Sequence, residues 1–147
     1  MKYLFCLLTI LMTFDLRAQT GEDKIGIERA LLNYVEGFYE GDTVKLMESL
    51  KPSMYKIGYW KNKTSGSYDY DGQMTYAQAI AYGREVLMKK NFAKPNAIKK
   101  VEVLDISQYT ASGKVYAWWG IDYILLSRQG NKWMIEQVLW EGPPQVK

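Results

Sequence analysis

Residues 114–126, KVYAWWGIDYILL, are the stretch on which the fold prediction rests. The stretch is rich in β-branched and aromatic residues, which favour β-strands, and it contains two adjacent tryptophans, Trp118 and Trp119. Asp122 lies near its middle among apolar neighbours. A carboxylate in this setting either points to solvent from a half-buried strand or works in a pocket. The face of the sheet that carries Asp122 therefore decides what the residue can do.

Two more strand-like segments flank this stretch. AIKKVEVLDIS, residues 97–107, precedes it, and KWMIEQVLW, residues 132–140, follows it. Turn residues separate the three segments, Ser112-Gly113 on one side and QGN at 129–131 on the other. We expect three long strands joined as an antiparallel meander.

The residues before 96 are predicted to form three helices and a short hairpin. The first helix runs from about Glu22 to Glu40, because apolar residues recur there at helical spacing, Tyr34 among them. Gly41 is expected to end it and Asp42 to cap a short second helix. MYKIGYW at 54–60 and SYDYDG at 67–72 form the predicted hairpin, and Thr75-x-x-Gln78 is a capping box for the third helix.

Three helices against a curved antiparallel sheet make an α+β layer architecture. A strongly bent sheet that wraps around a helix has the shape of a cone, closed at one end and open at the other. Concave apolar spaces of this kind are where proteins bind small molecules.

The first 18 residues have the pattern of a secretory signal peptide. Lys2 supplies the positive start, residues 3–14 are mostly apolar, and Ala18 is a small residue at the cleavage position. The apolar run is too short to span a bilayer. We expect cleavage after Ala18, which leaves residues 19–147 as a single secreted or periplasmic domain without a membrane anchor. A retained amphipathic anchor is the alternative.

The composition excludes several classes of site. The chain has no histidine, and its single cysteine, Cys6, lies in the expected signal peptide. Histidine-based catalysis, thiol chemistry and a zinc site are therefore not expected, and we predict neither a metal nor a cofactor. The formal net charge is only +3 and the basic residues are scattered, so nucleic acid is not an expected partner.

Four stretches carry a resemblance to a known family: IERALLNYVEGFYEGD (27–42), LKPSMYKIGYWKNK (50–63), KVEVLDIS (100–107) and IDYILLSRQGNKWMIEQVLWE (121–141). Together they resemble the putative lumazine-binding family of the nuclear transport factor 2-like superfamily. The resemblance spans nearly all of residues 19–147 and implies the same cone-shaped fold, in small exported bacterial proteins.

The chain departs from the family pattern at three positions. The resemblance implies histidine where this chain has Lys51 and Leu125, and asparagine where it has Gln137. If the two histidines belong to a family site, this chain lacks that part of it. Asp122 and Tyr123 match the pattern.

Strict strand alternation divides residues 114–126 between two faces. Trp119 and Tyr123 share the more apolar face, which we expect to pack toward the helices, and Asp122 lies on the other face, away from the core. A β-bulge would reverse this assignment and turn Asp122 into the cone. Burial there would raise the pKa of its carboxyl and make it a usable base.

The leading prediction is an exported domain that binds an unknown small apolar or aromatic molecule, without catalysis. Its expected ligand contacts are Tyr34, Trp60, Trp119, Tyr123 and Gln137. One alternative is a cofactor-independent dehydratase, isomerase or cyclase that uses Asp122 as its base. The other is an interaction module that forms a homodimer through the outer face of the sheet, where alternation places Tyr116, Trp118, Met134, Val138 and Trp140.

Overall fold

The computed structural model describes residues 2–143, with side chains from residue 21 onward. Three helices and six strands follow one another in this part of the chain: α1 (Lys2–Glu40), α2 (Thr43–Ser49), β1 (Leu50–Lys61), β2 (Tyr68–Thr75), α3 (Tyr76–Lys89), β3 (Lys100–Ile106), β4 (Thr110–Ala117), β5 (Gly120–Gln129) and β6 (Lys132–Gly142). The side chains of the expected signal peptide, residues 1–18, lie outside the described ones. Within the described residues, no helix combines the length and the apolar character needed to cross a membrane.

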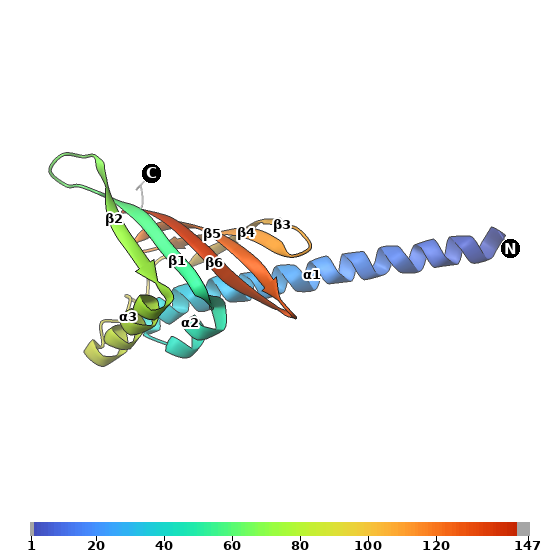
Figure 1. Cartoon of the computed structure of the whole chain (residues 1–147), viewed down its shortest axis with the longest axis horizontal. Helices are drawn as coiled ribbons and strands as arrows, with labels where there is room; N and C mark the ends of the chain where they lie inside the picture. The colour runs from blue at the N-terminus through green and yellow to red at the C-terminus, as the bar shows by residue number, and fades with distance from the viewer. Residues whose placement is uncertain (1, 144–147) are drawn as a thin grey trace.

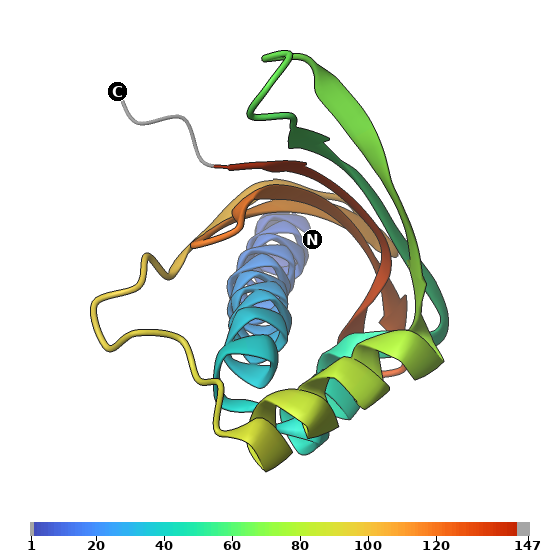
Figure 2. The same cartoon turned by 90° about the vertical axis from the view of Figure 1, so that its left-hand side faces the viewer.

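The sheet curves around α1, as the α+β prediction requires. Its strand order is β2-β1-β6-β5-β4-β3, and all neighbouring pairs are antiparallel except β1 and β6, which are parallel. The prediction of a wholly antiparallel sheet is therefore wrong at this one pair. Viewed end-on, the sheet arches over α1, and α2 and α3 lie along its lower border (Figure 2). Figure 1 shows the strands crossing α1 obliquely.

The predicted helix ends are confirmed, and they have clear physical causes. Gly41 follows α1 with φ +68°, a left-handed conformation that glycine adopts at low cost. The Asp42 side chain then accepts hydrogen bonds from the backbone N–H groups of Val44 and Lys45, which caps α2. The start of α1 differs, since the sequence prediction begins this helix near Glu22 and the structure begins it at Lys2.

The stretch 114–126 is two strands, and the prediction of one continuous strand is wrong. Ala117 pairs with Gly120, so Trp118 and Trp119 form the two-residue turn of a tight hairpin between β4 and β5. Gly120 has φ +148°, a conformation that other residues rarely adopt. The expected turn at Ser112-Gly113 lies instead inside β4, and β3 connects to β4 through residues 107–109.

Because of this hairpin, the alternation of side chains between the inner and outer faces of the sheet starts again at Gly120. Val115 and Ala117 of β4 and Ile124 of β5 all pack toward α1, while Tyr123 is on the outer face and half exposed. Asp122 is on the inner face and has no exposed surface. The turn restarts the period-2 pattern, so Asp122 faces inward without the bulge that the sequence argument required.

The alternation between the two faces is also interrupted in β6. The pairing with β5 shifts between Leu125 and Leu126, which leaves Glu136 as the extra residue of a β-bulge. Ile135 therefore faces inward before the bulge and Val138 faces inward after it, both fully buried. The prediction that Val138 lies on the outer face is wrong for this reason.

Candidate functional site

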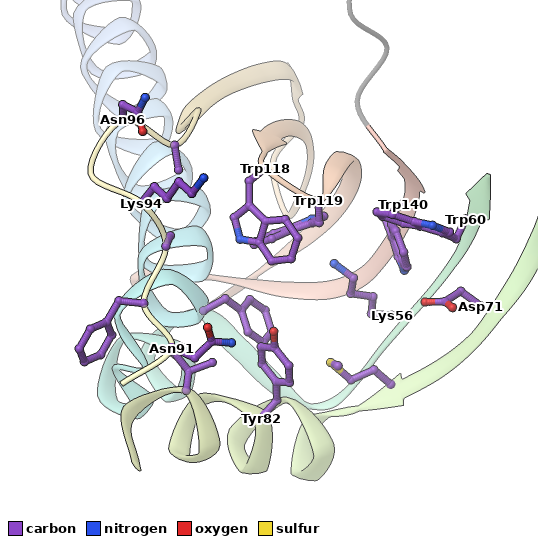
Figure 3. A pocket seen from close by; sticks show the side chains of 16 residues that line it. Lys56, Trp60, Asp71, Tyr82, Asn91, Lys94, Asn96, Trp118, Trp119 and Trp140 are labelled. Atoms are coloured by element: carbon purple, nitrogen blue, oxygen red, sulfur yellow. The ribbon is translucent and has the colours of Figure 1, made fainter. Parts of the chain in front are cut away.

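A cavity of about 890 Å³ lies at the open end of the cone, between the inner face of the sheet, α3 and the segment after α3. Most of its walls are apolar and aromatic. The lining residues include Phe38, Trp60, Met74, Tyr82, Val86, Phe92, Trp118, Trp119 and Trp140. Figure 3 shows Trp118, Trp119, Trp140 and Trp60 along the sheet side of this space and Tyr82 rising from α3. Its size lies within the range usual for small-molecule sites, roughly 300–1,000 Å³.

Lys56 is the only charged residue of this lining that is almost fully buried, with 8% of its surface exposed. It lies on β1 between Tyr55 and Ile57, which face outward, so alternation directs its side chain into the cone. Four aromatic rings surround its ammonium group. Nζ lies 4.9 Å from the ring centroid of Trp119, 5.2 Å from Trp140, 5.4 Å from Tyr34 and 5.9 Å from Phe38.

Asp122 is the counterion of Lys56. Its carboxylate accepts hydrogen bonds from Lys56 Nζ at 3.2 and 3.4 Å, from Tyr34 Oη at 2.8 Å, and from Trp119 Nε1 at 3.1 Å to both oxygens. Lys56 Nζ also donates to Tyr34 Oη at 2.8 Å. We refer to Lys56, Asp122, Tyr34 and Trp119 as the buried polar cluster. It joins α1, β1, β5 and the β4–β5 turn, and Tyr34 and Lys56 lie 88 and 66 positions from Asp122 in the sequence.

Burial and mutual charge decide the protonation of the cluster. Burial raises the pKa of Tyr34 well above its usual value, and the charge of Asp122 and the hydrogen bond to it add to the effect. Tyr34 therefore stays a neutral phenol that donates to Asp122. Burial also lowers the pKa of Lys56, an effect that the Asp122 carboxylate opposes.

Asp122 is poorly placed to act as a base on a bound molecule. Both of its oxygens already accept hydrogen bonds from the cluster, and Asp122 is not part of the cavity lining. Lys56 and Trp119 stand between it and the cavity, since both line the cavity and both donate to it. The geometry makes Asp122 the group that neutralises and positions Lys56.

Of the residues expected to contact a ligand, Trp60 and Trp119 line the cavity. Tyr34 is fully buried behind it, where its hydroxyl bonds to Lys56 and Asp122. The placement of Tyr123 and Gln137 in the cavity is wrong, because the β4–β5 turn and the β6 bulge carry both onto the outer face. They pair there with neighbours that also face outward, Leu139 and Leu125.

The predicted outer face also needs correction. Trp118 and Trp140, expected on it, line the cavity instead. The sequence prediction did not include Lys56, although it is the buried charge of the site. One signal was present, because strand alternation places Lys56 on the same face of β1 as Met54, Gly58 and Trp60.

The two positions where the sequence resemblance implies histidine, Lys51 and Leu125, lie away from the cavity. Lys51 Nζ pairs with Glu136 Oε1 at 2.6 Å, and the Leu125 side chain is 53% exposed on the outer face. Neither residue lines the cavity. The departures at these positions therefore leave the cavity lining intact. In the part of the chain whose side chains are described, no three histidine, cysteine, aspartate or glutamate residues gather in a way that could hold a metal ion.

The sequence profile of one protein family, described as "putative lumazine-binding", matches residues 22–141. This span includes every residue of the buried polar cluster and all of the strands except the last residue of β6, Gly142. No functionally curated protein matches the chain.

Solved structures share the fold at low sequence identity. A nuclear transport factor 2-like protein of unknown function from Silicibacter pomeroyi superposes with a TM-score of 0.63 at 14% identity, over 82% of this chain and 96% of that one. A similar protein of unknown function from Shewanella baltica gives 0.60 at 14% identity, over 84% and 95%. The β subunit of a "putative aromatic-ring-hydroxylating dioxygenase" from Novosphingobium aromaticivorans gives 0.55 at 7% identity, over 88% and 93%. At these identities the likeness shows the nuclear transport factor 2-like fold alone.

Proposed function

The chain belongs to the family described as putative lumazine-binding, and from this premise we propose that it binds a small apolar or aromatic molecule in the cone without transforming it. The observation that carries the proposal is the cavity of about 890 Å³ walled by Trp60, Trp118, Trp119 and Trp140. Indole rings offer flat apolar surfaces against which an aromatic ligand stacks favourably. The family name points to lumazine, a flat bicyclic heterocycle, which belongs to the same chemical class.

The absence of catalysis is part of the proposal, and the state of Asp122 supports it. A general base needs a free lone pair within hydrogen-bond reach of the substrate proton. The Asp122 oxygens are held by Tyr34, Trp119 and Lys56, on the far side of the cavity wall. A dehydratase, isomerase or cyclase that uses Asp122 remains the alternative, and it requires the cluster to open when substrate binds.

We also propose export with removal of residues 1–18. The signal-peptide pattern of residues 1–18 supports this, and residues after the expected cleavage site hold α1 against the sheet. Asp23 accepts a hydrogen bond from Trp133 Nε1 at 3.1 Å and forms an ion pair with Arg128 at 3.2 Å. Cleavage after Ala18 leaves both of these Asp23 contacts in place. Intact-mass measurement of the protein from its own host, after cell fractionation, tests both the compartment and the cleavage position.

The binding proposal is tested by releasing what the protein carries. Protein purified from its own host is denatured, and mass spectrometry of the released small molecules is expected to find an aromatic compound in stoichiometric amount. Replacing Trp60 by alanine removes a cavity wall and is expected to weaken the affinity for that compound about 10- to 100-fold, a loss of about 1.4–2.8 kcal/mol. Isothermal titration calorimetry measures the affinity.

Tyr109→Ala is the matched control, because it removes an aromatic ring that is 65% exposed and lies between β3 and β4, outside the cavity lining. Its affinity for the released compound is expected to equal that of the unchanged protein. Equal losses in Trp60→Ala and Tyr109→Ala would contradict binding in the cavity, and turnover of the released compound would favour the enzyme.

A homodimer through the outer face of the sheet is a second proposal, supported by the exposed side chains there. The face carries six large apolar side chains that are between 38% and 58% exposed: Tyr55, Tyr59, Tyr70, Tyr123, Leu125 and Leu139. Such a patch is unusually apolar for contact with water. A second copy that uses the same patch would bury both in a C2 dimer.

Leu125→Glu is expected to turn this dimer into a monomer, because it introduces a charge into the patch that the dimer would bury. Sedimentation velocity at micromolar concentration measures the change. Met88→Glu is the control, since Met88 is exposed on α3, away from the sheet, and should leave the dimer intact. A monomeric unchanged protein would refute the proposal.

A further inference from the structure

Lys56 Nζ donates a hydrogen bond to Tyr34 Oη at 2.8 Å and two longer ones to the oxygens of Asp122, at 3.2 and 3.4 Å. The 3.4 Å contact exceeds the usual length of an N–H···O hydrogen bond, so an acceptor in the cavity can compete with it for one N–H. Lys56 lines the cavity, and Figure 3 shows its nitrogen directed into the space between Trp119, Trp140 and Tyr82. The inner end of the cavity therefore presents one charged donor.

The positive and negative side chains in and directly behind the cavity lining are equal in number. Its lining contains two cations, Lys56 and Lys94, and one anion, Asp71, and the carboxylate of Asp122 lies directly behind Lys56. An anionic ligand group at Lys56 would leave water for an apolar space and would meet a lysine whose charge Asp122 already neutralises. Burying a charge without full compensation is costly. A neutral acceptor gains a charge-assisted hydrogen bond at a much smaller desolvation cost.

The rest of the lining agrees with a neutral aromatic molecule. Trp119 and Trp140, whose rings border Lys56 Nζ, are indoles that offer apolar surface to a flat ring. The polar side chains Asn91 and Asn96 belong to the segment after α3, on the opposite side of the cavity from Lys56 (Figure 3). A ligand can thus have one acceptor at the inner end, aromatic contacts along its length and polar contacts at the other end.

We propose that the ligand is a neutral, flat aromatic molecule with a carbonyl oxygen or ring nitrogen at one edge, and that Lys56 Nζ donates a hydrogen bond to this acceptor. The inference rests on the proposed binding function and adds the chemical class of the ligand. Asp122 and Tyr34 then act as positioning residues, because they hold the ammonium group against the cavity and neutralise its charge.

Three bicyclic probes of similar size test the proposal on the unchanged protein: indane, 1-indanone and indane-1-carboxylate. Ligand-observed NMR titration measures the dissociation constants. We expect 1-indanone to bind about tenfold more tightly than indane, the effect of one hydrogen bond to a charged donor. The carboxylate is expected to bind no more tightly than 1-indanone. The carbonyl ¹³C resonance of bound 1-indanone should move downfield from its position in free solution.

The double variant Lys56→Met/Asp122→Asn removes both charges together and leaves no lone buried ion. Its preference for 1-indanone over indane is expected to fall to about twofold or less. Tyr109→Ala, on the exposed β3–β4 connection, is the control and should keep the tenfold preference. If the double variant does not fold, the proposal is still tested by the unchanged protein, through the ratios of its dissociation constants for the three probes and the ¹³C shift of bound 1-indanone.

Equal affinities for indane and 1-indanone would overturn the inference while leaving the binding function in place. Tightest binding of the carboxylate would also overturn it and would make the cavity an anion site. If none of the three probes binds, the proposed binding function itself fails. The two failures are therefore distinguishable.

Discussion

Replacing Asp122 with alanine is expected to lower the free energy of unfolding by about 3–5 kcal/mol, because it leaves the ammonium group of Lys56 buried without a counterion. Asp122 is fully buried and accepts hydrogen bonds from Lys56, Tyr34 and Trp119, so the variant also removes the acceptor of two further donors. Urea denaturation followed by tryptophan fluorescence measures the change.

Two variants control this result. Glu85→Ala breaks the ion pair with Lys89 on the surface of α3, where both side chains are more than half exposed, and should leave stability unchanged within error. The double variant Lys56→Met/Asp122→Asn should recover most of the loss, because asparagine still accepts a hydrogen bond and methionine is apolar among the four rings. A loss below about 1 kcal/mol in Asp122→Ala would contradict a desolvated ion pair at this site.

Gly120→Ala is expected to cost about 3 kcal/mol or more, because two penalties act at one residue. The φ angle of +148° is unfavourable for alanine, and an added Cβ would lie 1.9 Å from the backbone oxygen of Glu141. That oxygen belongs to β6 and cannot move as a side-chain tip can. The hairpin that holds Trp119 and Asp122 should therefore shift away from β6, and near-ultraviolet circular dichroism should report the disturbed tryptophans.

Gly66→Ala separates the two penalties. Gly66 also has a positive φ, +73°, but an added Cβ would meet no atom within 4 Å. Only the conformational cost remains, about 1 kcal/mol. Similar losses in the two variants would show that the close approach of Gly120 to Glu141 contributes nothing to the fold.

Local sequence signals predict the elements of this protein well. Gly41, Asp42 and the Thr75–Gln78 capping box mark helix ends in the structure, as predicted, because a cap acts through backbone groups within three or four residues. The apolar stripe of the first helix, with Ile27, Leu31 and Tyr34, is fully buried, as its helical spacing predicts. These features together with the order of elements were enough to predict an α+β cone.

The contents of the cone were predicted less well. Trp118 and Trp119 are residues typical of strands, and the propensity argument placed them in one strand although they form a turn. Each misplaced turn or bulge moves every later side chain to the other face, because the strand period is two. The errors at Asp122, Tyr123, Gln137 and Val138 all have this single cause.

The helices, their caps and the strand-rich second half can be predicted from the chain alone, because they depend on interactions between near neighbours, and the family resemblance can be read there too. Which strand face turns inward and which charge is buried depends on the folded sheet. Lys56 and Asp122 lie 66 positions apart, and each can be buried only because the other neutralises it. No local pattern contains that pairing, since it exists only once β1 and β5 are both folded around α1.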